Sequence, residues 1–189
     1  MATFTAIYDA CVLYRAPLRD ILMWLSMTDL FRARWTDRIL DEWSRELLAN
    51  RPDLRPEQIE RTRRLMNEST LDCLVTGYED LIQGLELPDP DDRHVLAAAI
   101  RAQAGVIVTF NLKHFPSEYL ARFGTEAQHP DDFIMHLVDL SPGTVCMTAK
   151  LHRQNLRNPP KSVEEYLDTL ERQQLPKTVQ ALREFEELI

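Results

Sequence analysis

Val106-Ile107-Val108-Thr109-Phe110 is the stretch that decides the fold of this 189-residue chain. Its first four residues are all β-branched, which is typical of a strand buried on both faces of a parallel sheet. A helical pattern precedes it from Asp89 to Gln103, and Gly105 is expected to end that helix. Because parallel strands are joined through crossover helices, a helix followed by such a strand predicts an α/β fold.

The segments around this strand alternate between strand-like and helix-like patterns. Extended segments are predicted at 3–8, 31–35 and 72–76, and helices at 17–27, 36–49, 57–69 and 78–85. Short strand and helix units continue to about Leu137. This order predicts one three-layer domain over residues 1–140 with a mainly parallel central sheet.

The chain changes character after Ser141-Pro142. From there only helical patterns remain, at 142–153, 162–173 and 176–188. We expect residues 141–189 to form an all-helical C-terminal appendage. Its leucines are expected to pack on the main domain or on a partner; they are Leu167, Leu170, Leu175, Leu182 and Leu188.

The composition narrows the class of protein. The net charge of −8 disfavours a protein that coats nucleic acid, although residues 32–64 carry nine arginines and could touch it locally. Residues 78–92 carry six acids and no Lys or Arg, as a cation site or a solvated loop would. The sequence has no apolar run of about 18 residues and no basic segment before its first apolar residues, so neither a membrane helix nor a signal peptide is expected.

The cysteines and histidines suggest neither a disulfide framework nor a zinc site. Cys11, Cys73 and Cys146 form no CxxC pair, and the five histidines show no HExxH spacing. We therefore expect reduced thiols in a cytoplasmic protein.

Asp9 directly follows the first predicted strand. Ligands of open parallel sheets bind beyond the carboxyl ends of the strands, so Asp9 is a candidate site residue. The alternative is an ordinary turn or cap residue. Asn111 follows the strand 106–110 in the same way, either as an oxygen donor or as a turn former, and Lys113 beside it could meet a phosphate.

Two helices carry further candidate carboxylates. Asp89 is expected to cap the helix 89–103, with Pro90 at its first position. Asp92 shares the helix face that packs on the sheet, so it points back toward the sheet edge; stabilising the positive helix end is the alternative. Glu42 lies at the edge of the apolar face of helix 36–49, where it could reach the same sheet edge or pair with Arg38 or Arg45.

Carboxylates gathered at one edge raise each other's pKa unless a cation is present. Oxygen ligands favour Mg²⁺ or Mn²⁺. Such a cation can lower the pKa of a water and neutralise a phosphodiester during hydrolysis.

Four segments in order resemble the PIN-domain family, in particular the toxin nucleases of VapBC toxin–antitoxin pairs. They are residues 8–14, 39–43, 89–99 and 108–116, and the resemblance extends over roughly residues 3–138. It implies a metal-dependent endoribonuclease that hydrolyses RNA with metal-activated water, using Mg²⁺ or Mn²⁺. The helical tail lies outside the core pattern of the family.

The resemblance also implies the site residues. Asp9, Glu42 and Asp92 match the first three acids of a metal-binding quartet. The family usually has its fourth acid at or just after Asn111, often in a Lys-Asp-Phe sequence, where this chain reads Lys113-His114-Phe115. His114 thus stands in place of an acid, which would alter metal preference or weaken the enzyme, and Asn111 would hold a water.

The implied partners are an RNA substrate, a second copy of the chain and a cognate antitoxin that covers the acidic groove. The basic residues expected to contact the RNA backbone are Arg15, Arg19, Arg93 and Lys113. Two alternatives stand beside this interpretation. A haloacid-dehalogenase type phosphatase would need an acid where Cys11 stands, and a PIN-like module that only binds RNA or protein would tolerate His114.

Overall fold

The computed structural model describes residues 4–189, built around a four-stranded sheet. The strands are β1 (Phe4–Tyr8), β2 (Phe31–Arg34), β3 (Val106–Val108) and β4 (Glu126–Gln128), in the spatial order β2-β1-β3-β4. All three pairings are parallel, and Ile7 lies in register with Arg34 on one side and Ile107 on the other. The predicted parallel α/β sheet is confirmed; residue 3, where the first strand was expected to begin, lies outside the described residues.

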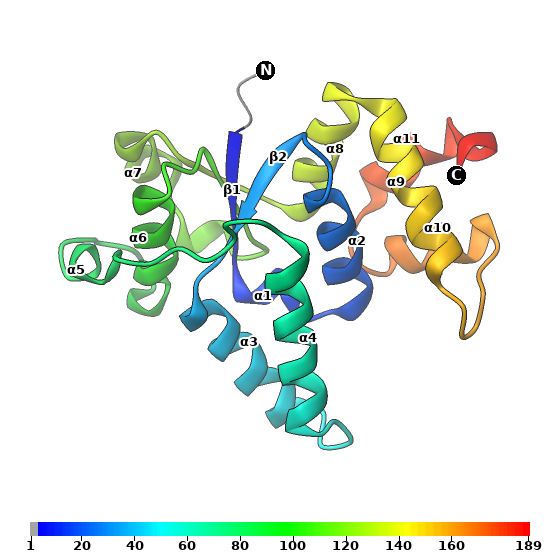
Figure 1. Cartoon of the computed structure of the whole chain (residues 1–189). Helices are drawn as coiled ribbons and strands as arrows, with labels where there is room; N and C mark the ends of the chain where they lie inside the picture. The colour runs from blue at the N-terminus through cyan, green and yellow to red at the C-terminus, as the bar shows by residue number, and fades with distance from the viewer. Residues whose placement is uncertain (1–3) are drawn as a thin grey trace.

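Helices cover both faces of the sheet (Figure 1). On one side lie α6 (Arg93–Arg101) and α7 (Ser117–Leu120), and on the other lie α2 (Ala16–Ser26) and α8 (Pro130–Leu140). The apolar face predicted for the helix 17–27 is buried as expected in α2. The Tyr8 hydroxyl of β1 donates to the Leu22 carbonyl of α2 at 3.1 Å, and the Tyr8 and Phe133 rings meet edge to face. The sheet therefore holds the core between two helical layers.

Helices α3 (Asp37–Asn50) and α4 (Pro56–Ser69) form an arm beyond the carboxyl ends of the strands (Figure 1). Thr36 caps α3 by accepting a hydrogen bond from the Ile39 amide at 3.1 Å. The face of Leu40, Trp43 and Leu47 is buried, as its spacing predicts. Arg63 of α4 ties the arm together by pairing with Asp37 and Asp41 of α3.

Four predicted elements differ in the structure. The strand expected at 106–110 ends at Val108. The strand expected at 72–76 is only a bridge between Leu74 and Trp35, because positive φ angles at Asp72 (52°) and Gly77 (70°) turn the chain away at both ends. The helix expected at 78–85 shortens to α5 (Glu79–Ile82). The helix expected from Asp89 begins as a 3₁₀ turn, η1 (Pro90–Asp92), before α6.

The C-terminal segment is helical, as predicted. It comprises α9 (Pro142–Asn155), α10 (Val163–Glu171), α11 (Pro176–Arg183) and the turn η4 (Glu186–Leu188). These helices pack on α2 and α8, burying every leucine named above except Leu188, which is 53% exposed. The domain division at residue 140 stays a prediction.

Two further features bear on the expectations from composition. The three cysteines are free. Among the described residues, every helix is too short or too polar to cross a membrane.

Candidate active site

Asp9 lies at the carboxyl end of β1 and is 4% exposed. Its amide donates to the Val108 carbonyl at 3.1 Å, which extends the β1–β3 pairing by one residue. Its side chain makes no cap on the short helix α1 (Ala10–Leu13). Instead Oδ2 accepts hydrogen bonds from the Thr109 hydroxyl at 2.7 Å and the Cys11 thiol at 3.1 Å. A capping role therefore does not account for this carboxylate.

The Cys11 thiol acts as a donor in this arrangement. Burial and the charge of Asp9 raise the pKa of Cys11 well above its usual value. The thiol therefore keeps its proton at neutral pH and can hold the Asp9 oxygen in place. Cys11 Sγ also accepts a hydrogen bond from the Phe110 amide at 3.3 Å, which joins α1 to the segment after β3.

Asp92 meets His114 at the same edge of the sheet. The His114 Nδ1 atom lies 2.7 Å from Asp92 Oδ2 and 3.7 Å from Asp89 Oδ2. Asp89 also keeps its predicted capping role, because its Oδ1 accepts from the Asp91 amide at 3.0 Å. Asp89, Asp92 and His114 each offer one ligand atom, and these atoms lie within 4.8 Å of one another.

The electrostatics of Asp92 link this group to Asp9. The pKa of Asp92 is raised, first by burial and then by the negative charges of Asp9 and Asp89, against the lowering effect of His114. Neighbouring carboxylates that raise each other's pKa are stabilised in the charged form by a cation. The charge of Asp9 therefore reaches Asp92, although Asp9 is not part of the three-residue group of possible ligands.

Glu42 is positioned by His94, which lies in the first turn of α6. Its Oε1 lies 3.0 Å from His94 Nε2 and 3.4 Å from Arg38 Nε. Burial alone would raise the pKa of Glu42, but the hydrogen bonds and charges of His94 and Arg38 together hold it below its usual range. The expected pairing with Arg38 is present. Glu42 does not join the group of Asp89, Asp92 and His114.

Asn111 shapes the turn that presents His114. Its amide donates to the Thr109 hydroxyl at 3.0 Å, and its carbonyl accepts from the His114 amide at 2.8 Å. Its side chain does not cap the following 3₁₀ turn, η2 (Leu112–His114). The turn-forming alternative is therefore present, and a role for the amide side chain as a ligand stays a prediction.

The four predicted RNA contacts have different surroundings. Arg15 and Lys113 are exposed, and the Arg15 guanidinium lies over the Phe110 ring at 5.9 Å. Arg19 is 12% exposed, pairs with Asp20 and stacks on Trp43, and its burial lowers its pKa. Arg93 is half-buried. Only Arg15 and Lys113 therefore present exposed positive charge.

Sequence reasoning missed two participants. Asp89 was explained fully as a cap, and its second oxygen was not considered as a ligand. His94 was not considered at all, although it follows Asp92 by two residues; it is 1% exposed and its Nδ1 has no partner among the described residues. The sequence did carry an indication of this role, because His94 lies on an apolar helix face two residues after Asp92.

Comparisons with known proteins match both parts of the chain. A family model described as PIN domain matches residues 5–113, and one described as VapC50 C-terminal domain matches residues 130–184. A protein of Mycobacterium tuberculosis (strain ATCC 25618 / H37Rv), named "Putative ribonuclease VapC50", is 53% identical over 64 residues, which are 34% of this chain and 37% of the relative. The chain thus spans little more than a third of that relative's length. No solved structure gives a significant match.

Proposed function

This chain belongs to the PIN-domain family, and on that premise we propose that it is a metal-dependent endoribonuclease and the toxin of a type II toxin–antitoxin pair. The relative's printed name, a ribonuclease of the VapC type, supports the substrate class. The observation that carries the proposal is the convergence of Asp89, Asp92 and His114, with Asp9 at the carboxyl end of β1. Ligands of open parallel sheets bind at this edge.

The side chains present suit a divalent cation. Two carboxylates and one imidazole nitrogen fall within reach of a single ion, and carboxylate oxygens favour Mg²⁺ or Mn²⁺. The raised pKa of Asp92 is the effect that a cation would reverse. When bound, the cation would supply positive charge to the phosphodiester and lower the pKa of a water.

The remaining residues would orient the reacting groups. Thr109 and Cys11 hold the Asp9 carboxylate in one orientation through its Oδ2. His94 and Arg38 lower the pKa of Glu42 and fix its position through their contacts with Oε1. From the family resemblance we assign Asp9, Asp92 and Glu42 to cation binding, and we add Asp89 because its carboxylate lies in one group with Asp92 and His114. His114 is assigned to the fourth position.

The substrate and protein contacts of this proposal rest on family membership. Asn111 is proposed to hold a water, and Arg15 and Lys113 to bind backbone phosphates, with Arg19 and Arg93 as weaker candidates. A homodimer, a cognate antitoxin over the acidic edge and a cytoplasmic location belong to the same proposal.

A second candidate function follows from His114. An imidazole in place of the fourth acid would lower the negative charge available to a cation, as in a PIN-like module that binds RNA or protein without cleaving it. One experiment separates the two candidates, since only an enzyme needs the cation for turnover.

The test uses the purified chain, free of other proteins, with single-stranded RNA. We expect cleavage with Mn²⁺ or Mg²⁺ and none with EDTA. Asp9→Asn and Asp92→Asn should each lower the rate by at least about 100-fold, because each removes a charge from the cation site. The matched control is Asp139→Asn, an exposed acid on α8, which should cleave like the parent. RNA binding without cleavage under any cation would support the second candidate instead.

A further inference from the structure

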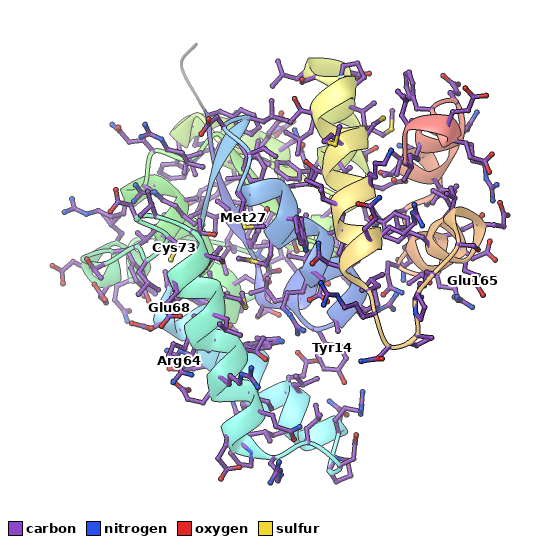
Figure 2. All side chains as sticks on the ribbon, turned by 45° about the vertical axis from the view of Figure 1, so that its right-hand side comes forward. Tyr14, Met27, Arg64, Glu68, Cys73 and Glu165 are labelled. Atoms are coloured by element: carbon purple, nitrogen blue, oxygen red, sulfur yellow. The ribbon has the colours of Figure 1, made fainter. Side chains whose placement is uncertain are left out.

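A cavity of about 490 Å³ lies between the start of α2, the α3–α4 arm and the C-terminal segment. Its lining includes Tyr14 and Arg15 before α2, Trp43 of α3, Thr62 of α4, and Gln173 after α10. Figure 2 shows Tyr14 in the region between the arm and the C-terminal helices. The volume falls within the range of small-ligand sites, roughly 300–1,000 Å³.

The charge of this cavity is positive. Three arginines line it, Arg15, Arg19 and Arg51, and no acid of the described residues does. Arg51 is engaged by Asp53 at 2.6 Å and Arg19 by Asp20 at 3.5 Å. Arg15 instead donates to the Arg172 carbonyl at 3.4 Å, so its charge remains available to an anion.

The inner surface of the cavity is apolar and partly aromatic. Leu47, Leu54 and Ile59 contribute its aliphatic part, with Tyr14 and Trp43 as aromatic neighbours. Trp43 is 1% exposed, and its Nε1 donor has no partner within the described part of the chain. An apolar recess with an arginine at its rim fits a ligand that has a flat ring and an anionic group.

The cavity adjoins the candidate active site. Arg15 lies over Phe110, which precedes Asn111, and Trp43 follows Glu42 directly on α3. A strand with one phosphate at the Asp9 edge would therefore pass the mouth of the cavity. Single-stranded RNA is commonly bound through bases turned out of the strand and stacked on protein side chains.

We propose that this cavity is a subsite for one nucleotide of the RNA strand. Arg15 binds the phosphate of that nucleotide, its base packs against Tyr14 and the aliphatic surface, and the Gln173 side chain lies near the base edge. The subsite rests on the proposed ribonuclease function, and it gives the C-terminal segment a part in substrate binding.

Binding can be measured without cleavage. The probe is a fluorescent single-stranded RNA oligonucleotide in EDTA, followed by anisotropy. Thr62→Met should fill the cavity from α4 and weaken binding at least about tenfold, the range expected when one stacked base is lost. Arg15→Gln should weaken binding and reduce the slope of log affinity against log salt by about one.

Arg64→Met is the control for both variants. Like Thr62→Met it places a methionine on α4, but on the exposed face, and like Arg15→Gln it removes a positive charge. Arg64 and Tyr14 lie on opposite sides of α4 in Figure 2. This variant should bind the RNA within about twofold of the parent, since surface substitutions of this kind cost little. Melting temperatures of all variants verify that they fold.

Cleavage gives the second measurement. With a divalent cation, Thr62→Met should raise KM for RNA at nearly constant kcat and leave hydrolysis of bis(p-nitrophenyl) phosphate unchanged, because that small diester does not reach the cavity. A folded Thr62→Met protein that binds RNA like the parent overturns the subsite and leaves the cavity to a protein segment. A third outcome is possible: the parent protein cleaves no RNA, but Thr62→Met still weakens RNA binding. That result overturns the ribonuclease function and supports the subsite.

Discussion

His114 places an imidazole nitrogen where the family resemblance places a carboxylate, 2.7 Å from Asp92. A neutral imidazole binds Mn²⁺ and later transition metals better than it binds Mg²⁺, which prefers oxygen ligands. In the absence of a cation, the same contact also lowers the pKa of Asp92 against the effect of burial and of Asp9. This one residue is therefore expected to set the metal preference of the site.

His114→Asp should shift that preference toward Mg²⁺. We expect the ratio of the Mg²⁺ and Mn²⁺ dissociation constants to fall by about tenfold, as ligand changes at metal sites commonly do. Isothermal titration calorimetry measures both constants directly, without reference to activity. The control is His136→Asp, an exposed histidine on α8. An unchanged ratio in the folded His114→Asp protein would remove His114 from the ligand set.

Asp131, in the first turn of α8, connects two helices that are distant in sequence. It is 3% exposed, and its carboxylate accepts from the Lys177 amide at 2.9 Å and the Thr178 amide at 2.8 Å. These amides belong to the first turn of α11, where helix donors lack partners within the helix. A negative charge there also interacts favourably with the helix dipole. One buried carboxylate thus fixes α11 against α8.

Asp131→Ala should destabilise the protein by about 2–4 kcal/mol, because it leaves buried donors without acceptors and removes a helix cap. Urea unfolding followed by circular dichroism measures this loss. Asp132→Ala is the control: Asp132 pairs with the exposed Lys177 side chain and should cost less than about 0.5 kcal/mol. Equal effects of the two substitutions would show that the buried cap is not what holds α11.

Across the whole molecule, the C-terminal helices join the domain through a buried interface that contains a histidine. His152 of α9 is 3% exposed, and its Nδ1 lies 3.0 Å from the Tyr166 hydroxyl of α10. Its ring also lies near Trp24 of α2, with the centroids 6.2 Å apart. Burial, aided by the charge of Lys161, lowers the pKa of His152 to about 4.

This interface should weaken in acid. The pKa of His152 is lower in the folded state than in the unfolded state, so its contribution is present above about pH 6.5 and is lost as pH falls toward 4. Between pH 7 and pH 5 we expect a loss of about 2 kcal/mol from this residue. Urea unfolding at both pH values should show that His152→Gln lacks this part of the decrease. The same decrease in both proteins would contradict the assignment.

Local patterns predicted most of the element order. The strand predicted at 106–110 became β3 over its first three residues, and the spacing of Leu40, Trp43 and Leu47 located the buried face of α3. Both depend on burial that repeats along a short segment, so the sequence carries them directly. The strand at 72–76 failed because turns at Asp72 and Gly77 limit its pairing, which propensity alone does not reveal.

The candidate site also has a part that the sequence predicts and a part that only the structure shows. By itself, the sequence showed that Asp9 follows the first strand and that Asp92 lies on the buried face of a helix, and it therefore predicted both at one sheet edge. Only the tertiary structure decided that His114 meets Asp92 and Asp89 and that Glu42 is held by His94. It also decided that Gln173 of the C-terminal segment lines the cavity beside the α3–α4 arm. These contacts depend on the register of the parallel strands and on the way helices pack across them. Both join residues far apart in the chain, so no local pattern encodes them.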